Sequence, residues 1–145
     1  MGTMMSVCGV MCSGCPAYQG AAKGEAHQCR TVEAWHRIYD LTETPERISC
    51  GGCLGLDDEL FHTQVQCKAR QCCLSKGYRS CAECSVDDCP DLEKAQSVWD
   101  GVPDLRSVLS ASDFETYAQP YCGHRARLGE LRAKRRTGGE CGRAG

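Results

Sequence analysis

The sequence has few of the side chains from which a hydrophobic core is normally built. Leucine, isoleucine, valine and phenylalanine supply 22 of its 145 residues, about 15%, below the roughly 20% that marks a core-poor chain. It also lacks the charge excess of a disordered polyelectrolyte, because the formal net charge is only −2. Cysteine is abundant instead, with 14 residues. We therefore expect cysteine chemistry to hold a compact fold together.

Long apolar runs are absent as well. None approaches the roughly 20 residues that a membrane-spanning helix needs. The first residues, MGTMMSVCGVMCSGC, have no Lys or Arg ahead of an apolar stretch of signal-peptide length, which argues against secretion. Because unpaired thiols persist in reducing compartments, we expect a cytoplasmic protein with reduced cysteines and no membrane association.

No stretch alternates apolar and polar residues for long enough to predict a sheet, and the nearest is a short extended segment around Ile48. Helical spacing is more frequent. In TVEAWHRIYDL, apolar residues recur at helical intervals, which predicts a helix with Thr31 as its N-cap and Pro45 as its far limit.

The second half of the chain predicts further helices. KARQCCLSK has good helix formers and precedes Gly77, so we expect a helix over residues 66–76 that ends at a glycine C-cap. Another should follow Pro90 in DLEKAQSVW, and a third should begin at Ser112 before an acidic first turn. HRARLGELRAKRR, residues 124–136, predicts a basic final helix.

The cysteines fall into groups with metal-ligand spacing. A tetrahedral zinc site needs thiolates at about 2.3 Å from the ion, and a two-residue gap lets one tight turn supply two of them. Cys50 and Cys53 enclose two glycines, which suit such a turn, and Cys81 and Cys84 repeat the spacing. A redox disulfide is the alternative for any single pair, but the βαβ pattern of a thioredoxin-like site is absent.

Ten grouped cysteines are the predicted metal ligands: Cys8, Cys12, Cys15, Cys50, Cys53, Cys67, Cys72, Cys81, Cys84 and Cys89. At four ligands per ion they fill two sites with two cysteines left over. The extra pair either joins a third site with Cys29 or a histidine such as His27, or two ions share bridging thiolates. We therefore expect two or three Zn²⁺ ions.

Helix geometry constrains how these ligands pair. Residues five apart on a helix differ by about 140°, so Cys67 and Cys72 face one ion only if Cys67 precedes the helix. Six residues are not expected to be ligands, three cysteines as ordinary thiols and three histidines as solvated or core side chains. They are Cys73, Cys122, Cys141, His36, His62 and His124.

These groups resemble a cysteine-rich bacterial and archaeal family, the domain-of-unknown-function family 3795. The resemblance rests on CGVMCSGCPAY, ISCGGCL and CKARQCCLSKGYRSCAECSVDDCPDLEK and covers about residues 6–95. It implies a zinc-binding domain, whose opening motif matches Cys8, Cys12 and Cys15, and it implies no established activity. Together the patterns predict a small, mainly α, irregular metal-stapled domain with short helices joined by cysteine knuckles and little or no sheet.

Three segments are expected along the chain. Residues 1–100 form the cysteine-rich metal-binding domain, residues 101–136 a helical extension packed on it, and residues 137–145 a glycine-rich disordered tail. The tail and final helix are basic, with a net charge of +5 from residue 125 onward.

The leading functional hypothesis is a non-catalytic zinc-binding protein that engages a protein or nucleic acid, with the basic final helix as a possible contact. An iron–sulfur redox protein is the alternative, because Cys8, Cys12 and Cys15 could hold a cluster with one further cysteine. Storage of copper(I) or zinc ranks last. No nucleophile motif supports a hydrolytic or acyl-transfer enzyme.

Overall fold

The structure, a computed structural model, describes residues 4–86 and 88–142, with side chains described as far as Arg136. Short helices and 3₁₀ turns dominate this part of the chain, and its only β pairings are two isolated bridges, Met5 with Met11 and Tyr18 with Cys50. The predicted mainly α fold is confirmed. The α-helices are α1 (Gly20–Lys23), α2 (Glu25–Tyr39), α3 (Lys68–Lys76), α4 (Pro90–Ser97), α5 (Ala111–Tyr117) and α6 (His124–Gly142).

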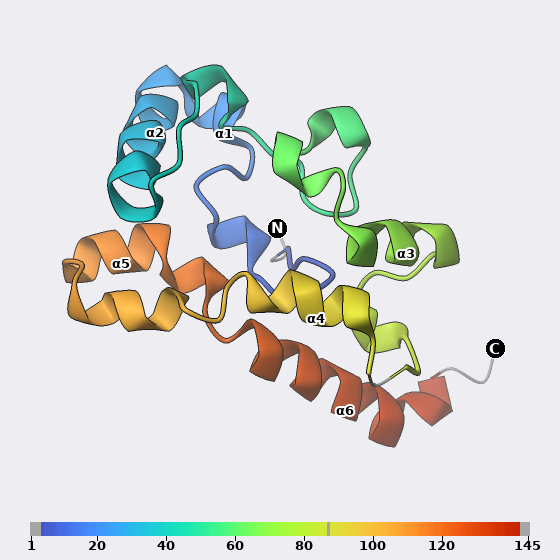
Figure 1. The fold of residues 1–145 in the computed structure, drawn as a ribbon. Helices are drawn as coiled ribbons and strands as arrows, with labels where there is room; N and C mark the ends of the chain where they lie inside the picture. Colours follow the sequence, from blue (N-terminus) through green and yellow to red (C-terminus); the bar gives the residue numbers. More distant parts are fainter. Residues whose placement is uncertain (1–3, 87, 143–145) are drawn as a thin grey trace.

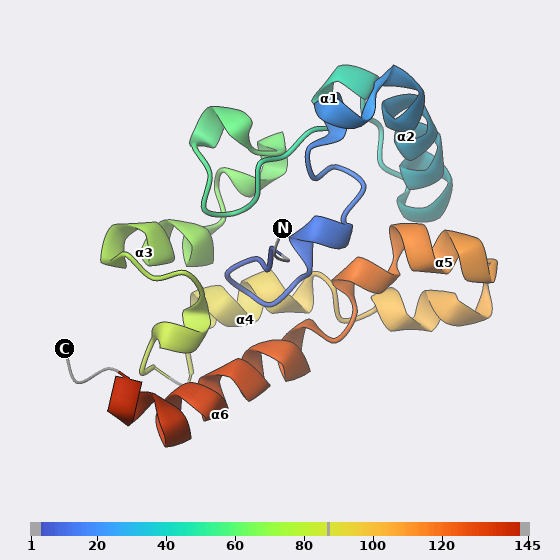
Figure 2. The ribbon, with the colours of Figure 1, turned by 180° about the vertical axis from the view of Figure 1, so that it is seen from behind.

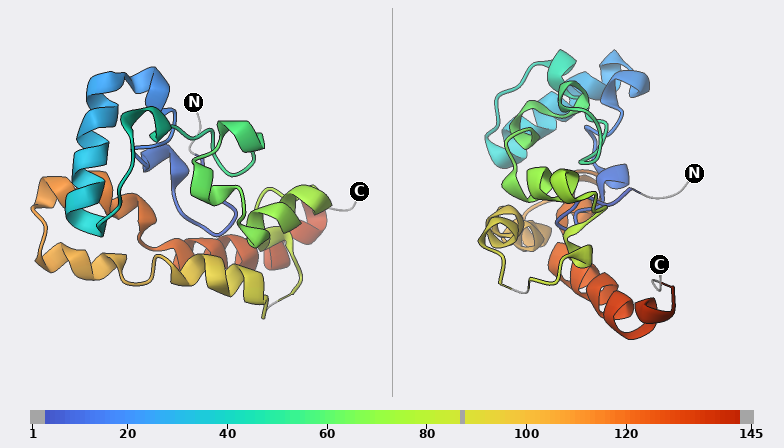
Figure 3. Two further views of the ribbon diagram at one scale, coloured as in Figure 1. Left: turned by 45° about the horizontal axis from the view of Figure 1, so that its top comes forward. Right: turned by 90° about the vertical axis from the view of Figure 1, so that its right-hand side faces the viewer.

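The N-terminal segment, residues 4–19, passes through the middle of the molecule, and the helices are arranged around it (Figure 1). Helices α1 and α2 lie at one end and α3 at the other, as the view from behind also shows (Figure 2). Helices α4 and α6 run along one side of the molecule (Figure 3). The central segment is largely buried, since Val7, Val10 and Ala17 are almost inaccessible to solvent.

Two of the helices follow the sequence prediction closely. Helix α3 ends at Gly77, whose φ of 72° gives the left-handed C-cap expected of a glycine there. Cys67 is the N-cap of this helix and so precedes it, which meets the condition under which Cys67 and Cys72 could approach one site. Helix α4 begins with Pro90 at its first position, one residue before the predicted start at Asp91.

Two predicted helix starts are wrong. Thr31 lies inside α2 rather than capping it, because the helix begins at Glu25 and the Thr31 hydroxyl donates to the carbonyl of His27 one turn back, at 2.9 Å. Helix α5 is capped by Ser110 rather than beginning at Ser112, since the Ser110 hydroxyl accepts the N–H of Asp113 at 3.1 Å.

The main core joins distant parts of the chain. Leu92 of α4, Phe114 of α5 and Leu128 of α6 pack with Val7 and Val10 of the central segment. Three buried cysteines, Cys8, Cys73 and Cys81, occupy the same cluster, so thiols fill space that aliphatic side chains fill in most proteins. Side chains beyond residue 100 therefore share one core with the cysteine-rich part.

A smaller core supports the other end of the molecule. Trp35 of α2 meets Phe61 edge to face, with ring centroids 5.4 Å apart and an interplanar angle of 89°, and Ile48 is fully buried beside them. Within the described residues no helix is both long and apolar enough to cross a membrane. Helix α6 continues to Gly142, and residues 143–145 of the predicted tail lie outside the described part.

Candidate functional site

Two cysteine turns meet at the centre of the molecule. Cys12 and Cys15 bracket a 3₁₀ turn of the central segment, and Cys50 and Cys53 bracket the two-glycine turn. A β bridge joins Tyr18 to Cys50, and the N–H of Gln19 donates to the Cys50 carbonyl at 2.8 Å. The sequence separates the two turns by more than 30 residues, yet these backbone contacts hold them together.

The Cys12 and Cys53 thiols lie close enough between these turns to shift each other's pKa. The neighbouring Cys12 thiol lowers the pKa of Cys53 to about 7, with help from the Val7 N–H and the Arg70 charge and against the effect of burial. The neighbouring Cys53 thiol, with burial, raises the pKa of Cys12. Cys15 and Cys50 also lie within electrostatic reach of Cys12. We call these four residues, Cys12, Cys15, Cys50 and Cys53, the first thiol group.

A buried arginine fixes the two-glycine turn on α3. The Arg70 side chain is only 1% exposed, and it donates to the carbonyls of Cys53 at 2.7 Å and Gly55 at 2.8 Å. Its remaining partner is Asp57, at 2.9 Å. Sequence analysis missed this residue, because an arginine in a helix normally lies on the solvated face and nothing in KARQCC marks it as buried.

Cys15 is a buried thiol with hydrogen-bond donors around it. Burial raises its pKa above the ordinary value of a cysteine, although the Tyr121 hydroxyl and the N–H groups of Ala17 and Tyr18 oppose that effect. The sulfur lies 3.0 Å from the Tyr121 hydroxyl oxygen. Tyr121 stacks on Trp99, with centroids 4.7 Å apart, so the segment after residue 100 contributes directly to this site.

A second thiol group lies at the end of α3. The Cys73 sulfur is 3.7 Å from the Cys81 sulfur, and both side chains are buried. Their hydrogen bond lowers the pKa of Cys73 and raises that of Cys81. Cys72 and Cys84 lie within electrostatic reach of Cys73. Sequence analysis left Cys73 as an ordinary thiol and did not anticipate that its sulfur lies beside that of Cys81.

The other predicted ligands lie around these groups. Cys8 is buried near Cys53 and Cys67, and burial raises its pKa to about 11. Cys89 is the N-cap of α4 and packs at the edge of the main core. The third site suggested for His27 and Cys29 gains no support: the His27 ring is bonded to the Pro16 carbonyl at 2.8 Å, and Cys29 is exposed.

Three of the residues that were not expected to be ligands make other contacts or are exposed to solvent. Cys122 contacts the carbonyl of Ala118, His62 pairs with Glu43 at 2.7 Å, and His36 is exposed. The side chain of Cys141 lies outside the described residues.

The described thiols approach one another in pairs and do not form a complete set of ligands around one point. Within residues 4–86 and 88–142, no three cysteine, histidine, aspartate or glutamate side chains are arranged to bind one ion. The predicted zinc sites and their ligand assignments therefore remain predictions. Four soft sulfur donors in each group match what Zn²⁺ prefers in a structural site.

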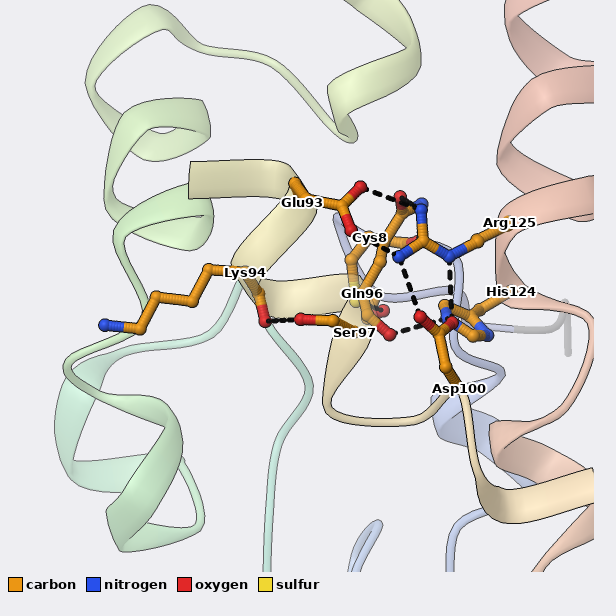
Figure 4. A network of polar contacts seen from close by, with 9 residues as sticks. Cys8, Glu93, Lys94, Gln96, Ser97, Asp100, His124 and Arg125 are labelled. Carbon is orange, nitrogen blue, oxygen red and sulfur yellow. Dashed lines mark hydrogen bonds and ion pairs between the residues drawn. The ribbon is translucent and has the colours of Figure 1, made fainter. Parts of the chain in front are cut away.

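A polar network fastens α4 and α6 beside the thiols (Figure 4). Arg125 binds the carboxylate of Glu93 at 2.8 and 2.9 Å and that of Asp100 at 2.8 and 2.9 Å, which lowers the pKa of both acids. The Gln96 amide donates to the Cys8 carbonyl at 3.0 Å, and the buried His124 ring contacts the Gln96 carbonyl at 2.8 Å. The network connects the backbone at Cys8 to α4 through Gln96, and α4 to α6 through His124 and Arg125.

Other basic side chains of α6 also contact the chain itself. Arg127 donates to the carbonyls of Gly9 and Cys122, and Arg132 donates to the carbonyl of Cys81 at 2.7 Å. Arg135 lies 3.9 Å from Glu83. Much of the basic character that suggested a nucleic-acid contact is thus directed at the cysteine turns, and the interaction role of this helix remains a prediction.

Comparison with known proteins gives a family but no function. Residues 4–94, more than half of the chain, match the model of a family described as a protein of unknown function, DUF3795. No curated protein and no solved structure matches the chain.

Proposed function

The chain belongs to the DUF3795 family, whose description assigns no activity. We propose from its thiols that the protein is a zinc-binding scaffold in which the first thiol group holds a structural Zn²⁺. Cys12, Cys15, Cys50 and Cys53 would be the ligands. The observation that carries this proposal is the meeting of two C-x-x-C turns, joined by the bridge between Tyr18 and Cys50.

The donor set suits zinc chemically. The ion binds thiolates, so protons must leave the site when it binds. At Cys53 the surroundings already favour that loss, because its pKa is about 7 and the buried Arg70 charge lies nearby. The pKa values of Cys12 and Cys15 are raised, although the N–H groups of Ala17 and Tyr18 oppose the effect of burial at Cys15, so the charge of the ion would have to drive proton loss at these two thiols. Binding would replace the thiol hydrogens of Cys12 and Cys53 with two sulfur–metal bonds.

The metal would add to the stability that the two small hydrophobic cores provide. A structural zinc contributes on the order of 10–16 kcal/mol of apparent binding energy that is also folding energy. The turns that carry its ligands have no long hydrophobic segment to anchor them, and Gly52, at φ 94°, adopts a backbone that other residues rarely reach. The site requires reduced thiols, so a cytoplasmic location is part of the proposal.

The iron–sulfur alternative is not favoured by the arrangement. It requires Cys8, Cys12 and Cys15 to share one cluster, but the cysteine neighbours of Cys8 are Cys53 and Cys67, whereas those of Cys12 are Cys53, Cys15 and Cys50. A role in binding another macromolecule remains a prediction that no contact in the structure singles out.

The test is metal content of the reduced full-length protein, measured by elemental analysis and native mass spectrometry after anaerobic purification. We expect bound zinc without colour, and Co²⁺ substitution should give the absorption of a tetrahedral thiolate site. Cys12→Ser and Cys50→Ser should each lose one ion. The matched control, Cys29→Ser, changes an exposed thiol on α2 and should lose none. A reduced wild-type chain that binds no zinc would overturn the proposal, and iron with acid-labile sulfide would replace it.

A further inference from the structure

Cys73 and Cys81 form a pair of thiols in direct contact outside the first thiol group. The Cys73 sulfur lies 3.7 Å from the Cys81 sulfur. A disulfide would place the two sulfurs about 2.05 Å apart, so they need to approach by only about 1.7 Å. Rotation about the Cα–Cβ bond of each side chain moves its sulfur without moving the backbone. A small local change is therefore enough to join the two thiols.

The backbone around the pair holds both cysteines in this position. As the chain reverses after α3, the N–H of Tyr78 donates to the Cys73 carbonyl at 2.9 Å. The N–H of Cys81 donates to the Val7 carbonyl at 3.0 Å, and the Cys81 carbonyl accepts a hydrogen bond from Arg132 at 2.7 Å. Both cysteines are thus fixed through their own backbone groups, so folding itself brings their sulfurs together.

The pair lies below the surface but close to it. Cys73 is 1% exposed and Cys81 is 7% exposed, and both belong to the main core. The segment between them, residues 74–79, is exposed or half-buried along its whole length. Burial keeps bulky thiols away from the pair, whereas hydrogen peroxide is little larger than water and needs only a local opening of this surface turn to reach a sulfur.

We propose that Cys73 and Cys81 form a reversible disulfide, which makes the end of α3 a redox switch operated by hydrogen peroxide. One thiol attacks the peroxide, whose O–O bond breaks; its sulfur becomes a sulfenic acid and one water leaves. The second sulfur then attacks the sulfenic sulfur, the S–O bond breaks, the S–S bond forms, and the hydroxyl leaves as water with the second thiol proton. Two thiols are oxidised to one disulfide, and one peroxide is reduced to two waters. A dithiol reductant restores both thiols by exchange and is itself oxidised to a disulfide.

The switch goes beyond the proposed zinc site and does not depend on it, because neither sulfur belongs to the first thiol group. It gives Cys81 a role other than the metal ligand expected from the sequence. Disulfides in reducing compartments are usually transient and redox-sensing, so a pair that rests as two thiols fits the proposed cytoplasmic location. Oxidation would tie the end of α3 covalently to the 3₁₀ turn Cys81–Glu83, which α6 contacts through Arg132 and Arg135.

The test maps disulfides in the reduced full-length protein, supplied with zinc, after reaction with one equivalent of hydrogen peroxide per chain. Remaining thiols are alkylated, and the protein is digested with trypsin without reduction. Cleavage after Lys76 and Arg79 separates the two cysteines, so their disulfide joins the peptides of residues 71–76 and 80–94. We expect this linked species as the first oxidation product, with fragmentation placing the bond between Cys73 and Cys81. Dithiothreitol should restore both thiols in the folded protein.

Cys73→Ser should lose the linked species. The matched control, Cys72→Ser, changes the adjacent residue of the same peptide and should keep it. Circular dichroism checks that each variant is folded, and if Cys73→Ser is unfolded, fragmentation of the wild-type species decides by itself. A first disulfide that involves Cys72 or Cys84, absence of the linked species, or a link that dithiothreitol does not reduce would overturn the inference.

The zinc content of the same samples separates this inference from the proposed function. A wild-type chain that binds no zinc but forms the link refutes the zinc proposal and supports the switch. A chain that keeps its zinc and forms no link refutes the switch alone. Loss of zinc as the link forms would show that the pair belongs to the metal site, which would also overturn the inference.

Discussion

Replacing Arg70 with methionine should strongly destabilise the protein. The buried guanidinium supplies the hydrogen-bond donors for the carbonyls of Cys53 and Gly55. Leaving a buried acceptor without a donor costs about 1–3 kcal/mol, and because Cys53 and Gly55 are only partly buried, the two lost donors predict about 2 kcal/mol, at the lower end of that range. The pair with Asp57 adds under about 1 kcal/mol, because that carboxylate is 71% exposed. Methionine fills much of the arginine volume, which keeps the cavity contribution small.

The assay is equilibrium unfolding in urea, followed by far-ultraviolet circular dichroism under reducing conditions at a fixed free zinc concentration. Lys68→Met is the matched control, since it removes one positive charge from the exposed side of the same helix. The reasoning would be refuted if the two variants had free energies of unfolding within about 0.5 kcal/mol of each other. In addition, loss of the Arg70 charge should raise the pKa of Cys53, which the pH dependence of its alkylation measures.

Three further results are expected. Tyr121→Phe should raise the pKa of Cys15, because the hydroxyl stabilises the thiolate; alkylation of Cys15 should then require a higher pH, and an unchanged profile would contradict the contact. Gly9→Ala should destabilise the fold by at least about 2 kcal/mol more than Gly24→Ala in thermal unfolding. Both glycines have positive φ, but only a Cβ at Gly9 would lie 2.2 Å from the His124 carbonyl oxygen, so equal effects would exclude the clash. Complete removal of metal by a strong chelator should abolish most of the helical signal, and its full retention would rule out a structural role for the ion.

The sequence predicts an element well where a single residue marks its boundary. Gly77 ends α3 and Pro90 begins α4, because a left-handed C-cap and a first helical turn each favour one residue type. The start of α2 is missed because its first turn is polar and shows no apolar period. For α5, two serines two positions apart offer equally good caps, and only the fold selects Ser110.

The thiol groups show the same limit. Spacing finds the C-x-x-C turns, since each turn is local. It does not find that Cys73 meets Cys81, because their contact depends on how the chain reverses after α3. Nor does it reveal the burial of Arg70, which is set by the carbonyls of a loop far away in the sequence.

The arginines of α6 limit where the chain can be truncated without loss of stability. Sequence similarity to the family ends at residue 94, yet Arg127 and Arg132 reach back to the carbonyls of Gly9 and Cys81. Cutting the chain at the limit of similarity would deprive these two carbonyls of their donors and expose the core face that Leu128 covers. The family segment and the helices after it should therefore unfold in one cooperative transition, and a fragment chosen by homology alone should be less stable than the full chain.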